Sequence, residues 1–189
     1  MDNGKLGPKS SKGGYHFDTS AAELVVLSPF DDTKSQVVTD MIRANLSGFQ
    51  EAGTVLASTW RRLRDIEKTY SREGTRYLVA EFKNTGEIVG GVGILPFAGL
   101  SFNERKGTIC DLFVNPAFRG QNIGKKLFNE VIYVGKQFGY ASMYLETTPE
   151  MLHAQKLFRR FGFRPISDRE DDKTKTSDEL ACYFILENL

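Results

Sequence analysis

The chain has 189 residues, of which 40% are hydrophobic and 26% charged, and its formal net charge is +1. This composition is typical of a globular domain, and a charge so close to zero gives no broad surface for nucleic acid or an anionic membrane. No apolar run approaches the about 20 residues that span a bilayer, and no signal-peptide core follows Met1, so we expect a cytoplasmic protein. Two histidines and the isolated Cys110 and Cys182 make a metal site very unfavourable, and both cysteines are expected to be buried free thiols.

The first third of the chain predicts a tail, one strand and two helices. Residues 1–21 are rich in Gly, Lys, Ser and Pro and predict a flexible tail, whereas 22–189 predict a single domain. Glu23–Leu27 predicts a strand. Asp32 or Thr33 is the expected cap of a helix that runs to Phe49, and a second helical stretch covers Glu51–Ser71. The expected apolar stripes are Val37, Met41, Ile42 and Leu46 in the first helix, and Val55, Leu56, Trp60, Leu63 and Ile66 in the second.

The second helical stretch carries a run of arginines, Arg61, Arg62 and Arg64. The favoured interpretation is a solvated helix face, balanced by Asp65 and Glu67. The alternative is a lip of a substrate site.

Two strands joined by a tight turn follow. Arg76–Lys83 predicts the first, Asn84-Thr85-Gly86 the turn, and Glu87–Phe97 the second. Glycines at 90, 91 and 93 weaken the second strand, which predicts a bulge or a close approach of another group to its backbone. Residues 98–106 are expected to form a loop.

The stretch Gly107–Phe138 is the centre of the sequence. Thr108–Val114 is a short apolar run that predicts a strand buried in a sheet, and Asn115-Pro116 ends it. A helix is expected next, because Ile123, Leu127, Val131, Val134 and Phe138 recur at helical spacing and Gly139 can close the helix.

The junction between this strand and helix has the features of a phosphate cradle. The first turn of a helix leaves backbone N–H groups unpaired at the positive end of the dipole. Gly120 and Gly124 let a ligand approach that backbone closely, and Arg119 and Lys125 add positive charge. The glycine spacing fits neither the dinucleotide fingerprint nor the P-loop. An ordinary strand–turn–helix corner is the structural alternative.

The last part of the chain adds a strand, a helix and a final strand. Ser142–Glu146 predicts the strand, Thr148 caps the helix with Pro149 at its first position, and Gly162 ends it. An extended segment at 163–165, a charged loop at 168–177 and a strand at 180–186 follow. This order predicts an α/β (α+β) sheet with helices on both faces and a right-handed crossover over 108–146. Two adjacent parallel strands in that crossover could splay and admit a ligand.

Two motifs in this order resemble the GNAT superfamily of N-acetyltransferases. Arg119-Gly120-Gln121-Asn122-Ile123-Gly124 is similar to the family's pyrophosphate-binding pattern Arg/Gln-x-x-Gly-x-Gly/Ala. Asn122 replaces a usual glycine, and asparagine is the best non-glycine residue in a left-handed conformation. The segment 154–163 is similar to the family's A-x-x-L-Y-x-x-x-G-F, and the resemblance covers about 22–187.

The resemblance implies a mixed, mostly antiparallel sheet of six to seven strands with a splayed parallel pair, and acetyl-CoA as acyl donor. The implied contacts to acetyl-CoA come from the strand residues Leu112, Phe113 and Val114, and from the loop and helix. In the family, a backbone N–H of the strand also binds the acetyl carbonyl, as an oxyanion donor does. The residues in the loop and in the first turn of the helix that follows are Arg119, Gly120, Gln121, Asn122, Ile123, Gly124 and Lys125. Phe158, in the later segment 154–163, is the last expected contact.

The implied chemistry is attack of a neutral amine on a thioester, which requires a base because an amine of pKa near 10.4 is protonated at pH 7. Asp111 and Glu146 are the candidates, since each is a carboxylate in an apolar strand beside the expected cleft. The bland alternative for each is a carboxylate that faces solvent or pairs with a lysine. Glu146 ranks slightly ahead because it ends its strand near the expected acetyl group.

Two positions depart from the family pattern. Phe158 stands where many relatives have a tyrosine that protonates the leaving thiolate, and Met151 stands where many have asparagine. We expect Phe158 to pack against the pantetheine arm or the core, and a thiol of pKa about 8.5 can leave without it. His153 is expected to be a surface residue.

The leading hypothesis is therefore transfer of an acetyl group to a primary amine of a small molecule. A protein or peptide amine, and a non-catalytic acyl-CoA-binding module, are the alternatives. Segments 33–75, 98–106 and 167–178 are expected to contact the acceptor, but none carries a motif. A homodimer is left open.

Overall fold

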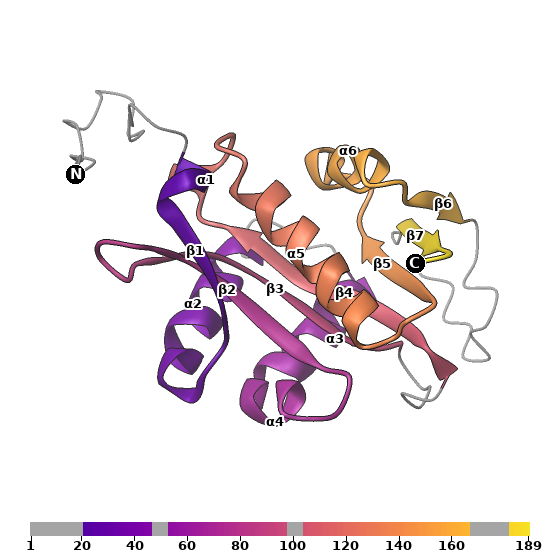
Figure 1. The fold of residues 1–189 in the computed structure, drawn as a ribbon, viewed down its shortest axis with the longest axis horizontal. Coiled ribbons are helices and arrows are strands. Elements are labelled where there is room, and N and C mark those ends of the chain that lie inside the picture. The colour runs from indigo at the N-terminus through magenta and orange to yellow at the C-terminus, as the bar shows by residue number, and fades with distance from the viewer. Residues whose placement is uncertain (1–20, 47–52, 98–103, 167–181) are drawn as a thin grey trace.

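The computed structural model describes residues 21–46, 53–97, 104–166 and 182–189. They form one seven-stranded sheet in the order β1-β2-β3-β4-β5-β7-β6 (Figure 1). All neighbours are antiparallel except β4 and β5, which are parallel. The fold class that the sequence predicts, including its parallel pair, is confirmed. Residues 1–20, for which we expect a tail, lie outside the described residues.

The strands are β1 (Val25–Pro29), β2 (Arg76–Phe82), β3 (Ile88–Pro96), β4 (Lys106–Val114), β5 (Ser142–Thr147), β6 (Arg164–Ile166) and β7 (Cys182–Glu187). The α-helices are α1 (Ala21–Leu24), α2 (Ser35–Leu46), α3 (Gly53–Leu63), α4 (Ile66–Tyr70), α5 (Ile123–Gln137) and α6 (Leu152–Arg160). Short 3-10 turns, η1 (Asp32–Lys34) and η3 (Pro116–Phe118), precede α2 and α5.

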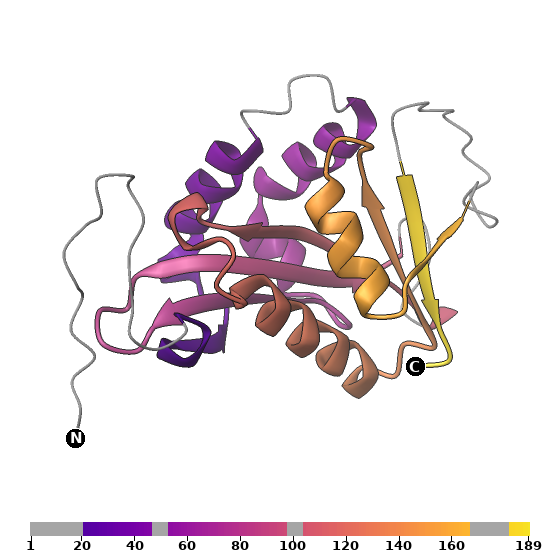
Figure 2. The same cartoon turned by 90° about the horizontal axis from the view of Figure 1, so that it is seen from above.

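Helices cover both faces of the sheet, and each face has its own apolar core. Figure 2 shows α2, α3 and α4 on one side of the sheet and α5 on the other. Leu127, Phe128 and Val131 of α5 are fully buried in the larger cluster. On the opposite face, Val38 and Ile42 of α2 pack with the side chains of α4 and β2. The ligand cleft expected from the sequence therefore has a helical layer on either side.

The parallel pair β4 and β5 stays together for only four residues. Lys106–Ile109 pairs with Ser142–Leu145, and the recorded pairing stops there. Beyond this point β4 still pairs with β3, while β5 continues against β7. The two strands therefore separate toward their C-terminal ends, where a ligand has access to their backbones.

The N-terminal half departs from the sequence prediction in its boundaries. The first strand begins at Val25, because Ala21–Leu24 forms a helical turn. The side chain of Asp31 accepts a bond from the Thr33 amide and caps η1, the turn that leads into α2, whereas the sequence predicts Asp32 or Thr33 as the helix cap. Helix α2 is described only to Leu46, and residues 47–52 lie outside the description. Of the predicted stripe, Val37 is exposed, because it points away from the sheet.

The expected second helix is two helices. Helix α3 ends at Leu63, and the side chain of Asp65 accepts a bond from the Lys68 amide and caps α4. A residue predicted to balance the arginines thus starts a new helix instead. Trp60, predicted on the apolar side, is 40% exposed. The side chains of Val55 and Leu56 lie outside the description.

The remaining boundaries agree with the prediction, with one exception. Helix α6 begins at Leu152, after Met151, and not directly after Thr148. The side-chain amide of Gln155 donates to the carbonyl of Thr148 at 3.0 Å, and the main-chain amide of Met151 donates to the same carbonyl at 3.2 Å. These bonds close residues 148–151 into a turn that precedes the helix. No helix within the described ranges is long and apolar enough to cross a membrane.

Candidate functional site

A cavity of about 120 Å³ lies where β4 and β5 separate. Residues from α2, α3, β4, β5 and α6 line it, so it opens between the two helical layers. The lining includes both predicted carboxylates, Asp111 and Glu146. The other lining residues are Ile42, Asn45, Leu46, Ser58, Thr59, Arg62, Thr108, Ile109, Cys110, Leu112, Phe113, Leu145, Thr147, Met151, Ala154 and Phe158.

The strand residues expected to meet pantetheine lie at this cavity or beside it. Leu112 and Phe113 line it, while Val114 lies just beyond. Phe113 and Val114 pair with Gly91 and Gly90 of β3, so one edge of β4 is already bonded. Its other edge faces the separated β5. Because an unpaired strand edge offers N–H and C=O groups to an extended partner, this edge suits a linear ligand with amides of its own.

The loop between β4 and α5 has the left-handed residues that its sequence requires. Gly120 has φ +79°, and Asn122 has φ 64° and ψ 5°. Asn122 therefore occupies the conformation expected from its place in the motif. Ile123 is 1% exposed and anchors the first turn of α5 in the core. The amides of this turn have no intrahelical acceptors, and they lie beside the end of β4.

Gly124 leaves open space at the start of α5. A Cβ atom built there would meet only Val114 Cγ2, at 3.5 Å. This is an ordinary van der Waals distance, so the fold itself does not require glycine at this position. The free space above the first-turn amides is what an anionic group would occupy.

The two charged residues of the loop lie at the surface, and one of them is held by hydrogen bonds. Arg119 and Lys125 are exposed, and Gln121 is half-buried. The Arg119 guanidinium donates to the Val114 carbonyl at 3.1 Å and to the side-chain oxygen of Asn45 in α2. Arg119 thus joins the loop to the opposite helical layer, which no pattern in the sequence indicates.

Lys126, which we did not single out, holds the N-terminal segment against α5. Its ammonium donates to the carbonyls of Ala22 at 2.9 Å and Val25 at 2.6 Å. The last carbonyls of a helical turn lack partners, and Lys126 supplies one for Ala22 of α1 and binds Val25 at the start of β1 as well. Its spacing in the sequence gives no signal of this.

Glu146 lies near the end of β5, at the point where β4 has already separated. It is half-buried, lines the cavity, and its strand position pairs with Tyr183 of β7. Alternate residues of a strand share a face, so Glu146 lies on the same face as Tyr144, which packs against Phe97. By the parallel register of Thr108 with Tyr144, this is also the face of Cys110.

Asp111 is tied into a buried ion pair. Its side chain is 1% exposed, and Arg62 donates to both oxygens, from Nε at 2.8 Å and from Nη2 at 2.7 Å. The Tyr70 hydroxyl adds a third bond at 2.7 Å. The preferred prediction that Arg62 belongs to a solvated helix face is wrong, because its side chain is 18% exposed and turned into the sheet. Arg61 and Arg64 are exposed, as predicted.

Three further polar groups share this interior. Burial raises the pKa of the Cys110 thiol to about 12, and it raises the pKa values of the Tyr70 and Tyr77 phenols well above 10. Nearby Asp111 acts in the same direction on all three. These groups are therefore neutral at physiological pH. Cys110 and Cys182 are both free thiols, as predicted, but both are half-buried where full burial is expected from the sequence.

Phe158 packs in the aromatic core and also lines the cavity. Its ring is 4% exposed, stacks on Phe128 at 5.3 Å, and meets Phe184 edge-on at 5.8 Å. Packing against the core is one of the two environments expected for it. Met151 lines the cavity, whereas His153 is exposed and does not.

Two hydroxyls at the cavity lack partners. The Oγ1 atoms of Thr108 and Thr147 are buried, and neither has a hydrogen bond within the described residues. An unpaired buried hydroxyl costs about 1–3 kcal/mol. Both residues belong to the separating strands and line the cavity, so a ligand with polar groups could pair with them.

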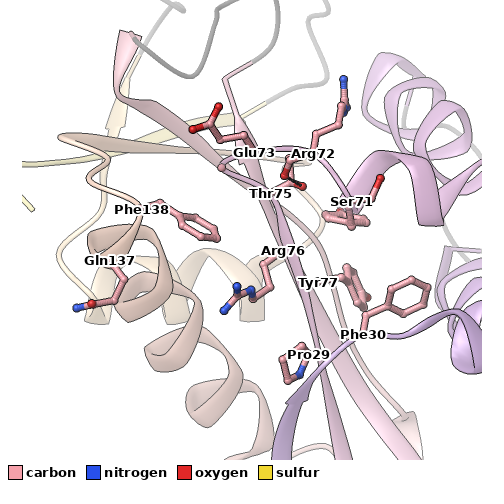
Figure 3. Close-up of a pocket in the computed structure, with 12 residues that line it drawn as sticks. Pro29, Phe30, Ser71, Arg72, Glu73, Thr75, Arg76, Tyr77, Gln137 and Phe138 are labelled. Atoms are coloured by element: carbon pink, nitrogen blue, oxygen red, sulfur yellow. Dashed lines mark hydrogen bonds between the residues drawn. The ribbon is translucent and has the colours of Figure 1, made fainter.

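A larger hollow of about 600 Å³ lies elsewhere, between the 71–76 turn and the end of α5. Figure 3 shows Arg76 and Phe138 on facing sides of it, and the guanidinium carbon is 5.3 Å from the ring centre. Its lining includes neither the glycine loop (residues 119–125, between β4 and α5) nor either candidate base. The smaller cavity between β4 and β5 is therefore the better candidate for the reaction. No group of three or more His, Cys, Asp or Glu residues in the described ranges could hold a metal ion.

Comparison with known proteins identifies one family and several relatives. A model of the acetyltransferase (GNAT) family matches residues 42–163. An uncharacterised N-acetyltransferase of Escherichia coli, YjgM, is 35% identical over 107 residues, which cover 55% of this chain and 60% of that protein. The chain spans about half the length of the curated relatives that it matches.

Solved structures have the same fold. A GNAT acetyltransferase of Staphylococcus aureus superposes with a TM-score of 0.71 at 20% identity, over 87% of this chain and 99% of that one. YncA of Salmonella typhimurium, solved with acetyl-CoA, has a TM-score of 0.63 at 17% identity, over 88% and 95% of the two chains.

Proposed function

Because the chain belongs to the GNAT family of acetyltransferases, we propose that it transfers the acetyl group of acetyl-CoA to a primary amine of a small molecule. The observation that carries this proposal is the cavity where β4 and β5 separate, with Glu146 in its wall and the glycine loop beside it. A donor held along β4 would have its thioester at this cavity. The amine would enter from the side of α2 and α3.

The donor site follows from the backbone. The pyrophosphate of acetyl-CoA would lie on the amides of residues 120–125, with Arg119 and Lys125 adding charge. The pantetheine arm carries amides, and the unpaired edge of β4 at Leu112–Val114 can bond them as another strand would. Gln121, Asn122, Ile123 and Gly124 shape the loop, and Phe158 forms part of the wall beside the thiol end.

The reaction requires a neutral amine. Its nitrogen attacks the thioester carbon, the C–S bond breaks, and the products are an amide and the CoA thiol. Deprotonating an amine of pKa about 10.4 at pH 7 costs about 4–5 kcal/mol, so a base near the nitrogen accelerates the reaction. A backbone N–H of β4 would stabilise the oxyanion of the tetrahedral intermediate.

Of the two carboxylates, Glu146 suits the base better. Asp111 already accepts three hydrogen bonds, two of them from Arg62, so proton uptake there would disrupt a buried ion pair. Glu146 lines the same cavity and is half-buried at the end of its strand. Phe158 cannot donate a proton, so the leaving thiolate would take its proton from water.

The cavity volume supports a small acceptor. About 120 Å³ accommodates an acetyl group and the end of an amine, and is well below the roughly 300–1,000 Å³ of sites that enclose a whole drug-sized ligand. A compact amine therefore fits best. A peptide amine would reach the site only with its terminal atoms.

The test is release of thiol from acetyl-CoA with a panel of small amines and with peptides. We expect turnover with a small amine, and Glu146→Gln should lower kcat at pH 7 by about 10²-fold, with a smaller loss at high pH where the amine deprotonates unaided. Glu150→Gln, an exposed carboxylate nearby, is the matched control and should keep full activity. Asp111→Asn should leave the shape of the pH profile unchanged.

Three results would contradict parts of this proposal. Full activity of Glu146→Gln at pH 7 would place the base elsewhere. Turnover with peptides alone would make the acceptor a protein. Tight binding of acetyl-CoA without transfer to any amine would favour a non-catalytic acyl-CoA-binding module.

A further inference from the structure

Asp111 has a backbone conformation that is unusual for its type. Its φ is 53°, in the left-handed region, and it lies at an irregularity of β4. Gly91 pairs with Phe113 and Gly93 with Cys110, so two β4 residues stand opposite one β3 residue. This is a β-bulge, which bends a strand and increases its twist. Left-handed backbone is unfavourable for residues with a Cβ atom, so other contacts must hold it.

Side chains from three elements supply those contacts. Arg62 of α3 binds both carboxylate oxygens, and the Tyr70 hydroxyl of α4 binds one of them. From β2, the Tyr77 hydroxyl donates to the main-chain carbonyl of Asp111 at 3.0 Å. The side chain and the backbone of one residue are thus both fixed. Four hydrogen bonds on a buried bulge residue are more than an ion pair alone requires.

The glycines of β3 make room for this arrangement. A Cβ atom on Gly93 would lie 2.1 Å from the Tyr70 hydroxyl oxygen, and one on Gly91 would lie 2.7 Å from that of Tyr77. Both distances are shorter than the 3.0 Å that a Cβ atom keeps from a non-bonded neighbour. The two tyrosine rings therefore cross β3 only because its side chains are missing there. The close approach that the glycines predict from sequence is confirmed, and the approaching groups are these rings.

The bulge lies where the cleft opens. Pairing of β4 with β5 ends at Ile109, two residues before Asp111, and residues 110–113 line the cavity. A bend at Asp111 directs the following N–H groups, which the proposed function assigns to the acyl donor. In Figure 3 the Tyr77 ring lies against Phe30, which packs on it edge-on at 6.0 Å and holds it toward β3.

We propose that Arg62, Tyr70 and Tyr77 are positioning residues that fix Asp111 in its left-handed conformation, and that Asp111 shapes the acyl-donor cleft through its backbone. This inference rests on the proposed function, because it assigns the bulge to acetyl-CoA binding. It predicts that residue 111 needs the right backbone conformation, whereas a base would need the carboxylate.

Two double variants separate these roles. Arg62→Met/Asp111→Gly and Arg62→Met/Asp111→Ala both remove the whole ion pair, so neither leaves a buried charge unpaired. They differ by one methyl group. Glycine adopts left-handed backbone readily, whereas for alanine the cost corresponds to roughly 5- to 30-fold in an equilibrium constant.

Calorimetry with acetyl-CoA is the measurement. We expect both variants to bind acetyl-CoA more weakly than the unaltered protein, because Arg62 and Tyr70 no longer hold residue 111 through its carboxylate. The alanine variant should bind about tenfold more weakly than the glycine variant. Tyr77→Phe removes a single hydroxyl and keeps the packed ring, so it gives a second test if the alanine variant does not fold. It should raise the KM for acetyl-CoA about threefold to tenfold and leave the pH profile of kcat unchanged.

The outcomes distinguish this inference from the proposed function. Equal affinities of the glycine and alanine variants, or an unchanged KM in Tyr77→Phe, would overturn the positioning role alone. A glycine variant that binds normally but loses kcat at pH 7 and regains it at high pH would make Asp111 the base. Failure of the unaltered protein to bind acetyl-CoA would overturn the proposed function itself, and this inference with it.

Discussion

Replacing Arg62 alone by methionine should destabilise the protein strongly. Methionine keeps much of the arginine stem but leaves the Asp111 carboxylate, which is 1% exposed, without its cation. Breaking one side of a buried ion pair costs about 3–5 kcal/mol. For a chain of this length, each kcal/mol lowers Tm by roughly 2–4 °C, so we expect a fall of roughly 6–20 °C.

Urea unfolding monitored by circular dichroism measures the loss of unfolding free energy, and a thermal scan measures the fall in Tm. Arg61→Met is the matched control, since Arg61 is the preceding residue of α3 and is exposed. An exposed substitution of this kind should change the unfolding free energy by no more than about 0.5 kcal/mol. Adding Asp111→Asn to Arg62→Met should recover part of the loss, because the unpaired charge is then gone. If Arg62→Met and Arg61→Met unfolded at the same urea concentration, the ion pair described here would not exist in solution.

Three further predictions concern the core around the site. Gly93→Ala should lower the unfolding free energy and weaken acetyl-CoA binding, since its Cβ would lie 2.1 Å from the Tyr70 hydroxyl oxygen. Gly86→Ala is the control for backbone strain alone, because a Cβ there meets nothing within 4 Å but φ is +69°. Equal affinity of the two variants for acetyl-CoA would argue against the clash. Phe158→Tyr should not raise kcat and should cost roughly 1–3 kcal/mol if its hydroxyl is buried without a partner; a several-fold rise in kcat with unchanged CoA affinity would show that thiolate protonation limits the reaction. The unfolding free energy should fall as pH rises from 9 toward 12, by up to about 1.4 kcal/mol per pH unit from Cys110, because this thiol ionises near pH 9 when unfolded and near 12 when folded. Urea unfolding of Cys110→Ala at pH 8 and 10 should show a smaller fall than that of the unaltered protein. An equal fall would exclude this thiol as a cause.

The loop before α5 could be predicted from the sequence because its requirements are local. Asn122 and Gly120 adopt the left-handed conformations that their residue types favour. The strand, the helix and their order also depend on periodicity within one short segment. The same holds for the glycines of β3, whose missing side chains indicate a close approach without saying which groups approach.

The role of Arg62 could not be predicted, because it depends on tertiary packing. Three arginines within four residues look alike in the sequence, and only the rotation of α3 against the sheet selects Arg62 for the interior. Its partner Asp111 lies 49 positions further along the chain. The division of the second helix at Asp65 was missed for another reason. Its side chain was assigned to charge balance, although aspartate is also a strong cap.

The left-handed conformation of Asp111 has a weak local signal. Aspartate is among the few residues other than glycine that tolerate this region, but a strand interior is an unusual place for it. The conformation follows from Tyr70, Tyr77 and Arg62, which reach it from other elements. A sequence therefore shows that Asp111 is a carboxylate beside the cleft, and the fold shows which of its atoms are already engaged.

The proposal that acetyl-CoA is bound by the loop before α5 is tested most directly by calorimetry with Gly124→Glu and Gly124→Gln. A Cβ at this position meets only Val114, at 3.5 Å, so both variants should fold. Their side chains would occupy the space above the first-turn amides, and the glutamate would also repel the phosphates. We predict that acetyl-CoA binding is weakened in Gly124→Gln and abolished in Gly124→Glu. Unchanged affinity in Gly124→Glu would contradict the central claim.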